Sequence, residues 1–217
     1  MKSPKIFTSS KLSHSNISKI GILILAAGAS KRMGFPKQLL PWNGSTLLNH
    51  TLTQAELSIA NEVHVVLGAN ADKIKKSIES SMATVHVYHE WDSGLGSSIA
   101  YGVKQIIKNE CQIDGLLIML SDQPEVDSNY LNSLIQMYIP KMKQIAATSY
   151  SSNLGVPAIF DVCYFDELVK LNGDTGAKQI IINNSANVIA FVPEKYLIDI
   201  DTLETYEMLI KGQFKNH

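Results

Sequence analysis

The chain has 217 residues, with 45% hydrophobic and 18% charged residues and a formal net charge of −1 at pH 7. Its length corresponds to one domain, since domains commonly have about 100–200 residues. The near balance of 19 basic and 20 acidic residues excludes a general nucleic-acid-binding protein and a polybasic membrane-surface protein.

Residues 1–19 are rich in Ser and Lys and lack the apolar core of a signal peptide. No apolar stretch approaches the length of about 20 residues that a transmembrane helix needs. We therefore expect a cytoplasmic protein with a flexible arm at residues 1–19 and a single domain at residues 20–217.

Apolar runs and amphipathic segments then alternate along the chain. The pattern predicts a strand at 20–26, a helix at 45–58, a strand at 63–67, a helix at 71–80, a strand at 84–88 and a helix at 96–108. It continues with a strand at 115–120, a helix at 128–139, strands at 144–150 and 157–160, a helix at 175–184, a strand at 188–192 and a helix at 203–211. Ser45 is the expected N-cap of the first helix. Ile99, Val103, Ile106 and Ile107 form the expected apolar stripe of the helix at 96–108.

This alternation predicts βαβ units and an α/β fold, a three-layer Rossmann-like arrangement with a mainly parallel mixed sheet. Ligands of such folds bind beyond the carboxyl ends of the strands. The segments that follow Leu25, Leu67, Tyr88 and Leu120 are therefore the places to search for a site.

The loop after the first strand reads Leu25-Ala-Ala-Gly-Ala-Ser-Lys-Arg-Met-Gly-Phe-Pro-Lys-Gln-Leu-Leu-Pro41. Its small residues let a ligand approach the backbone, whose N–H groups can line an anion site. Arg32 can bind phosphate oxygens in a fork, and Lys37 supplies a compact charge. The loop is neither a Walker A loop nor G-x-G-x-x-G. It suits a polyphosphate, with a glycine-rich turn carrying solvated cations as the alternative.

The pattern L-A-A-G-x-S-x-R-M-G-x-P-K-x-L-L resembles the signature loop of nucleotidyltransferases that build molybdenum cofactor dinucleotides. The resemblance is closest to the molybdenum cofactor cytidylyltransferases, and it implies the fold of nucleotide-diphospho-sugar transferases. Guanylyltransferases of that family usually have Gly-Gly in place of Ala26-Ala27, so this pair favours cytidine. The resemblance also implies that Arg32 and Lys37 hold phosphates and that the nucleotide is cradled by Leu25, Ala26, Ala27, Gly28, Ala29 and Ser30.

Carboxylates follow two further segments. Asp122 comes directly after the strand at 115–120, where a carboxylate opposite a phosphate loop is placed to bind Mg²⁺, and Asp122-Gln-Pro124 resembles the family's metal-binding motif. Asp199-Ile-Asp-Thr202 resembles the family's closing D-I-D-T segment. Alternation along a strand would put Asp199 and Asp201 on one face, so either is a candidate second metal ligand. Thr202 fits the N-cap of the last helix.

Three shorter motifs complete the resemblance. The first is Trp91-Asp-Ser-Gly-Leu-Gly-Ser-Ser98, which is similar to a W-x-x-G-[ML]-x-S-S segment of the family. A helix that begins there would offer Ser97 and Ser98 to the nucleotide at its N-terminus. The alternative is an ordinary capped start of a helix. Gly155-Val-Pro157 resembles a G-H-P stretch near the second substrate, which implies acceptor contacts from Gly155 and Pro157. Gly173-Asp-Thr-Gly-Ala-Lys178 resembles G-D-x-G-A-[RK]. Asp174 would either cap the next helix or contact the acceptor, and the resemblance implies that Lys178 reaches a substrate phosphate.

Cysteine and histidine add no motif. Cys111 and Cys163 lie in no C-x-x-C, and no Cys/His spacing resembles a zinc site. We therefore expect reduced thiols and histidines without a metal.

The resemblance spans residues 20–210. It implies an Mg²⁺-dependent enzyme, with Arg32, Lys37 and Asp122 as catalytic residues, that transfers CMP from CTP to the phosphate of the molybdopterin cofactor and releases pyrophosphate. A molybdenum hydroxylase would be a recipient of the product. Two alternatives stay open. One is cytidylyl or guanylyl transfer to another phosphate, such as a sugar or methylerythritol phosphate, and the other is a non-catalytic protein that binds and delivers the cofactor.

Overall fold

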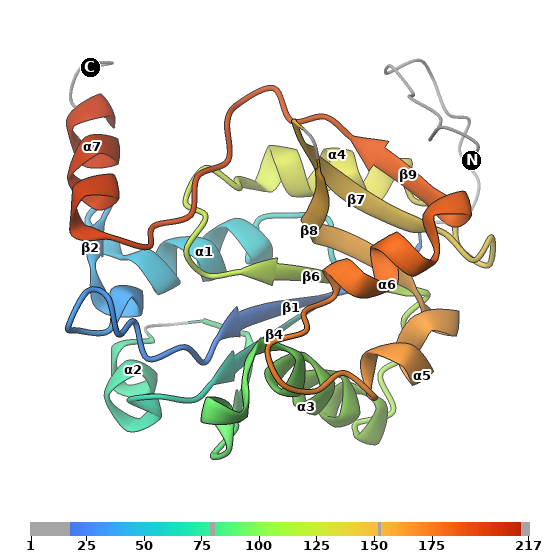
Figure 1. Ribbon diagram of the computed structural model, residues 1–217, viewed down its shortest axis with the longest axis horizontal. Helices are drawn as coiled ribbons and strands as arrows, with labels where there is room; N and C mark the ends of the chain where they lie inside the picture. The colour runs from blue at the N-terminus through green and yellow to red at the C-terminus, as the bar shows by residue number, and fades with distance from the viewer. Residues whose placement is uncertain (1–17, 79–80, 152, 214–217) are drawn as a thin grey trace.

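The computed structural model describes residues 18–78, 81–151 and 153–213. All but Ser18 and Lys19 of the expected N-terminal arm lies outside the described residues. A seven-stranded sheet forms the centre of the molecule, in the order β5-β4-β1-β6-β8-β7-β9 (Figure 1). Its strands are β1 (Ile20–Ala26), β4 (Glu62–Leu67), β5 (Thr84–Val87), β6 (Gly115–Leu120), β7 (Ile145–Tyr150), β8 (Asn153–Asp161) and β9 (Val188–Phe191).

The sheet is mainly parallel, as expected. β5, β4, β1 and β6 pair in parallel, and so do β7 and β9. β8 pairs antiparallel with both β6 and β7. The short strand expected at 157–160 is thus the second half of a nine-residue strand with a partner on each side. The α/β fold with a mixed sheet is confirmed.

Helices cover both faces of the sheet and make three layers (Figure 1). One core joins the sheet to α3 (Leu95–Lys108), α5 (Phe165–Leu168) and α6 (Lys178–Asn183), and a second joins it to α1 (Leu47–Glu56), α2 (Ala71–Ser77) and α4 (Ser128–Met137). All seven residues of β1 are buried, and they alternate between the two cores: Leu23 and Leu25 face the first, Ile22 and Ile24 the second. Such two-sided burial explains the continuous apolar run.

A third, smaller core lies beside the sheet. It packs α7 (Leu203–Gln213) against the hairpin of β2 (Pro41–Trp42) and β3 (Ser45–Thr46), around the buried indole of Trp42. Tyr206 on α7 donates a hydrogen bond of 2.8 Å to the carbonyl oxygen of Pro41. Among the described residues there are also 3-10 helices at η1 (Lys37–Leu39), η2 (Trp91–Ser93), η3 (Val162–Tyr164) and η4 (Ser185–Asn187). None of the helices in the described part of the chain has the length and apolar character needed to cross a membrane.

Some expected boundaries were wrong, each for a local reason. Ser45 is not the N-cap of α1, because it pairs with Trp42 in the hairpin; the cap is Thr46, which accepts a hydrogen bond from the Asn49 N–H. Ile107 does not belong to the buried stripe of α3 and is 48% exposed.

The last helix on the α3 side also starts later than expected. Residues 175–177 precede α6, because the segment 172–175 packs closely against the first turn of α3. The N–H of Gly96 donates to the carbonyl oxygen of Gly173 over 2.8 Å. A Cβ atom at Gly96 would lie 2.3 Å from the carbonyl oxygen of Thr175. The glycine therefore permits backbone to approach backbone at this point.

We predict that Gly96→Ala destabilises the protein by about 1–3 kcal/mol, the usual cost of overpacking. The matched control is Gly212→Ala in α7, where an added Cβ meets nothing within 4 Å. There the better helix propensity of Ala should leave stability unchanged or raise it by up to about 1 kcal/mol. Urea unfolding followed by circular dichroism measures both, and equal stability of Gly96→Ala and wild type would contradict the close packing.

Candidate active site

The loop that follows β1 is held in a defined shape by its own polar groups. Ser30 has a left-handed backbone with φ of 54°, its carbonyl oxygen accepts from the Met33 N–H, and its Oγ accepts from the Lys37 N–H. The buried side chain of Gln38 donates to the carbonyl oxygens of Ala26 (2.8 Å) and Gly28 (3.0 Å). These bonds link both ends of the loop and hold its shape.

The loop brings Lys37 to the end of β6. Its ammonium group forms an ion pair and hydrogen bond with Oδ2 of Asp122, and a second with Oδ1 of Asp201 over 3.1 Å. Arg32 pairs with the other oxygen of Asp201 over 3.0 Å. The three residues predicted to be catalytic therefore lie in one charged cluster, joined through Asp201.

Asp199 belongs to the same neighbourhood through a different link. Gln123 donates to Oδ1 of Asp199 over 2.8 Å and to the Tyr150 hydroxyl over 3.0 Å. The expectation that Asp199 and Asp201 alternate along a strand was wrong, because the segment before α7 is irregular. The backbone of this segment is instead fixed by the Ile200 N–H, which donates to the carbonyl oxygen of Asp122.

The charges of the cluster shift one another's protonation. Burial raises the pKa of Asp122; Lys37 opposes this effect, and the carboxylates of Asp199 and Asp201 add to it. Burial acts to lower the pKa of Lys37, but the contacts with Asp122 and Asp201 outweigh it and the pKa is raised. Lys37 therefore remains a cation at neutral pH and is the main electrostatic partner of Asp122.

The donor set of the cluster suits Mg²⁺. Oδ1 of Asp122 is buried and has no hydrogen-bond partner among the described residues. Carboxylate oxygens are the ligands that Mg²⁺ prefers, and it usually takes only one or two of them together with phosphates and waters. In the described chain, Asp122, Asp199 and Asp201 do not bring ligand atoms together as a preformed three-carboxylate group, and Lys37 lies between Asp122 and Asp201.

A cleft of about 380 Å³ opens beside this cluster, at the carboxyl ends of β1 and β6. It is the size of a small-molecule site. Of the residues predicted from the sequence, the lining includes Leu25, Ala26, Ala27, Gly28, Ala29, Lys37, Ser98, Asp122 and Asp174. Gln38, Trp91 and Asp92 also line it and were not among the predicted site residues. A buried Gln two residues after a Pro gave no signal in the sequence, because its partners are backbone oxygens.

The other predicted residues are not among those that line the cleft. They are Ser30, Arg32, Ser97, Gly155, Pro157, Lys178, Asp199 and Asp201. The Ser97 hydroxyl donates to the carbonyl oxygen of Ser93 and accepts from the Gly173 N–H. Asp174 does not cap α6, whose N-cap is Ala177 and has no side-chain cap bond. Thr202 does accept from the Thr205 N–H at the start of α7, as expected of an N-cap.

Gly155 and Pro157 lie in β8, which pairs with β7, the strand that ends at Tyr150. The Tyr150 hydroxyl donates to the carbonyl oxygen of Val156, between the two predicted acceptor residues, and accepts from Gln123. A continuous chain of hydrogen bonds thus leads from β8 through Tyr150 and Gln123 to Asp199. The sequence did not predict Gln123 and Tyr150 as site residues, because the hydrogen bonds that connect them join four segments that are separate along the chain.

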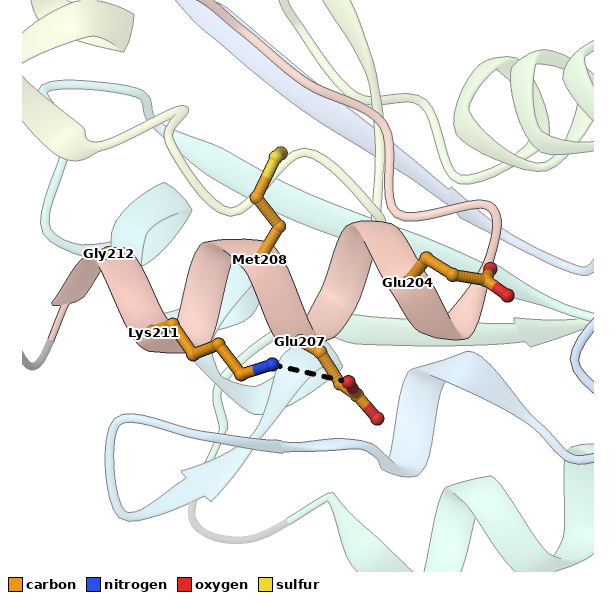
Figure 2. Close-up of a pocket in the computed structure, with 5 residues that line it drawn as sticks. All are labelled: Glu204, Glu207, Met208, Lys211 and Gly212. Atoms are coloured by element: carbon orange, nitrogen blue, oxygen red, sulfur yellow. Dashed lines mark ion pairs between the residues drawn. The ribbon is translucent and has the colours of Figure 1, made fainter.

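A second hollow, of about 490 Å³, lies along α7 (Figure 2). Its lining residues Glu204, Glu207, Met208, Lys211 and Gly212 all belong to this one helix. Lys211 pairs with Glu207 across one helical turn over 3.6 Å, which is an ordinary surface pair. The residues that could bind or react with a polyphosphate converge on the first cleft and not on this one.

Comparison with known proteins agrees with the geometry. Residues 22–188 match the family model of the MobA-like NTP transferase domain. The chain is 30% identical over 205 residues to the purine catabolism protein PucB of Bacillus subtilis, an alignment that covers 88% of this chain and 95% of PucB. It is also 30% identical over 200 residues to nicotine blue oxidoreductase of Paenarthrobacter nicotinovorans, covering 87% and 95% of the two chains.

Solved structures of similar proteins share the fold of this chain. Rv0371c from Mycobacterium tuberculosis matches with a TM-score of 0.79 at 27% identity, over 91% of this chain and 100% of that one. Its complex with manganese matches with a TM-score of 0.75 at 26% identity, over 89% and 99%. Because the family match runs from β1 to the start of β9 and includes the loop that carries Lys37, the chain belongs to the family of MobA-like NTP transferase domains.

Proposed function

We propose that this nucleotidyltransferase moves CMP from CTP to the phosphate of a molybdopterin-type cofactor. The observation that carries the proposal is the cluster of Arg32, Lys37 and Asp122 beside the cleft, with a buried Asp122 oxygen that has no hydrogen-bond partner among the described residues. A site built only to hold a turn would not need two cations and a buried carboxylate at the edge of a cavity.

In the proposed reaction, an oxygen of the acceptor phosphate attacks the α-phosphorus of CTP. The bond from that phosphorus to the bridging oxygen breaks, and pyrophosphate leaves with the electron pair. Arg32 and Lys37 would stabilise the negative charge on the transferring and leaving phosphates. A phosphate acceptor is already anionic near neutral pH, so no general base is required.

Mg²⁺ is the proposed metal, and it would neutralise charge on the phosphate oxygens. Asp122 and one of Asp199 and Asp201 are its candidate ligands. The manganese complex of Rv0371c supports a divalent cation in this family. Incoming phosphates would give Lys37 another anionic partner, which would release the Asp122 carboxylate from its contact with the ammonium group.

The base and the acceptor are the finer parts of the proposal. Ala26 and Ala27 line the cleft. Cytidine is favoured over guanine because guanylyltransferases of the family that the loop resembles usually have Gly-Gly in place of this pair. Gly155, Pro157, Asp174 and Lys178 are the proposed acceptor residues. A molybdenum hydroxylase is the proposed recipient of the product, and delivery without catalysis or transfer to another phosphate are the alternatives.

Redox chemistry is a second candidate, because one relative at 30% identity is named an oxidoreductase. The two activities leave different products. Pyrophosphate appears only in nucleotidyl transfer, while a redox reaction consumes a reduced or oxidised cosubstrate and needs no nucleoside triphosphate.

We expect pyrophosphate release when the protein is mixed with Mg²⁺, molybdopterin cofactor and CTP, and not with ATP, GTP or UTP. The four nucleotides are assayed separately with a coupled pyrophosphate assay. Release with GTP alone would support nucleotidyl transfer but show that the enzyme uses guanine and not cytosine nucleotides. Release with none of them, together with oxidation of a reduced nicotinamide cofactor by the same preparation when a dye is added as electron acceptor, would replace the proposal with the redox candidate.

We predict that Asp122→Asn lowers kcat by at least about 100-fold, since it removes the charge of the carboxylate that is proposed to hold Mg²⁺ and keeps the side-chain shape. Asp72→Asn, on the exposed first turn of α2, is the matched control and should behave as wild type. Both variants are compared by pyrophosphate release after circular dichroism has shown that they fold. Activity of Asp122→Asn close to wild type would remove Asp122 from the mechanism.

We predict that Lys37→Met lowers kcat by about 100- to 1,000-fold, as for other charged groups that stabilise a developing anion. Because Lys37 lowers the pKa of Asp122, its loss should also move the acid limb of the pH–rate profile to higher pH. Lys104→Met, on the exposed side of α3, is the control for loss of one positive charge. An unchanged rate in Lys37→Met would make the loop a passive turn.

A further inference from the structure

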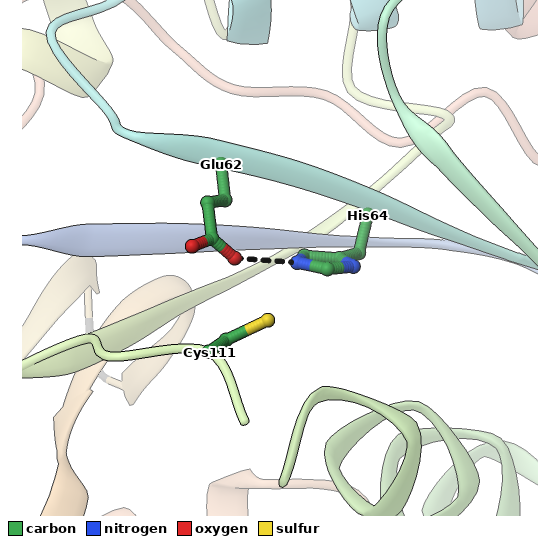
Figure 3. Close-up of side chains that lie close together, drawn as sticks. All are labelled: Glu62, His64 and Cys111. Carbon is green, nitrogen blue, oxygen red and sulfur yellow. Dashed lines mark hydrogen bonds and ion pairs between the residues drawn. The ribbon is translucent and has the colours of Figure 1, made fainter. Parts of the chain in front are cut away.

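Three side chains of different chemistry converge at the other end of the sheet, away from the cleft (Figure 3). Glu62 and His64 lie on β4, and Cys111 lies in the loop between α3 and β6. One carboxylate oxygen, one imidazole nitrogen and the sulfur atom all lie within 4.8 Å of one another. Glu62 is the first residue of β4 and is opposite Gly21 of β1, whereas the cleft begins at Leu25. The two places are therefore at opposite ends of the strands.

The orientation of His64 is fixed from both sides of its ring. Nε2 lies 3.3 Å from Oε2 of Glu62, and Nδ1 lies 3.1 Å from Nε2 of His86 on the neighbouring strand β5. The two imidazoles are stacked, with centroids 5.4 Å apart and planes 14° from parallel. Burial lowers the pKa of His64, and burial and the neighbouring His64 lower the pKa of His86 to about 4.

This arrangement does not suit a nucleophilic cysteine. In such a site the thiol faces one nitrogen of the imidazole and the orienting acid faces the other. Here the second nitrogen of His64 contacts His86, and Figure 3 shows the Cys111 sulfur pointing toward the side of the ring that faces Glu62. The oxygen, the nitrogen and the sulfur share one space in front of Nε2, as ligands of a common ion do.

We propose that Glu62, His64 and Cys111 bind a zinc ion, with water as the fourth ligand. Carboxylate oxygen, imidazole nitrogen and thiolate sulfur are the three donor types that zinc uses in proteins. Mg²⁺ and Ca²⁺ prefer oxygen alone, so the thiol selects against the ion proposed for the cleft. Glu62 is 36% exposed and Cys111 is half-buried, so an ion can enter from solvent while His64 stays buried.

Binding involves a defined transfer of protons. Without metal, a thiol such as that of Cys111 is mostly protonated near neutral pH. When zinc binds, the S–H bond breaks, its proton leaves to solvent and a Zn–S bond forms. His64 would then coordinate through Nε2 and donate its Nδ1–H to Nε2 of His86. A second residue that fixes the tautomer of a ligating histidine is a regular feature of zinc sites.

No other group of three or more His, Cys, Asp or Glu side chains in the described segments brings ligand atoms this close. The expectation that the histidines bind no metal rested on spacing along the chain. His64 and Cys111 are far apart in sequence, and the pairing of β4 with β1 and of β1 with β6 brings them together.

The test uses the full-length chain, stripped of metal with a chelator and titrated with Co²⁺ as a spectroscopic substitute for zinc. We expect one equivalent of Co²⁺ to produce thiolate-to-cobalt charge-transfer absorption, which Zn²⁺ removes and a large excess of Mg²⁺ does not. Cys111→Ser should lose this absorption. Cys163→Ser is the matched control and should retain it, since Cys163 is exposed and its thiol contacts Asp161.

A second variant guards against misfolding of Cys111→Ser. Glu62→Gln replaces a half-exposed carboxylate and should weaken zinc affinity at least about tenfold in competition with a chromophoric chelator. Absence of the charge-transfer absorption in the wild-type protein at saturating Co²⁺ would overturn the proposal, and so would its survival in Cys111→Ser or unchanged affinity in Glu62→Gln. Cobalt held elsewhere, by His14 or His217 for example, would produce no thiolate absorption and counts against the site.

Discussion

The ammonium group of Lys37 joins three parts of the chain that are far apart in sequence. Its backbone belongs to the end of the loop after β1, and its side chain reaches Asp122 after β6 and Asp201 before α7. Burying a charged ammonium group costs free energy unless the charge is paired. The folded state is therefore stabilised when both carboxylates lie at this point. The charged cluster at the edge of the cleft follows from that requirement.

The small third core makes this arrangement possible. Trp42 lies just beyond Lys37 in the chain, and its indole packs with Ile200, next to Asp201. The hydrogen bond from Ile200 to Asp122 and the packing of α7 on the β2–β3 hairpin hold the same segment from two directions. Apolar packing thus sets the position of Asp201, while the ion pairs set the orientation of its carboxylate.

The two ends of the sheet carry different chemistry. At the carboxyl ends of β1 and β6, carboxylates and cations surround a cleft and suit phosphates with a hard divalent ion. At the amino end of β4, oxygen, nitrogen and sulfur donors converge and suit a softer ion. Because the donor types differ, the two ions would not compete for one site, and the amino-end cluster is free to contribute stability without touching the nucleotide.

Much of the architecture follows directly from local patterns. The apolar run of β1 required a strand buried on both faces, the alternation of strands and helices required a mainly parallel sheet, and the edge rule for such sheets directed attention to the loop with Lys37 and to Asp122. What local patterns could not supply was the partner of each side chain. Ser45 looked like a helix cap until its pairing with Trp42 took it into a hairpin, and Asp199 and Asp201 looked like a strand face although their segment is irregular.

The sequence by itself therefore determined the fold class, and it singled out the loop after β1 and Asp122 as candidate site residues. The tertiary structure alone decided that Gln38 shapes the loop, that Gln123 and Tyr150 connect β8 to Asp199, and that Glu62, His64 and Cys111 meet. The reason is physical: periodicity along a chain reports which face of an element is buried, whereas contacts between side chains depend on strand order, which is set by the packing of the whole sheet.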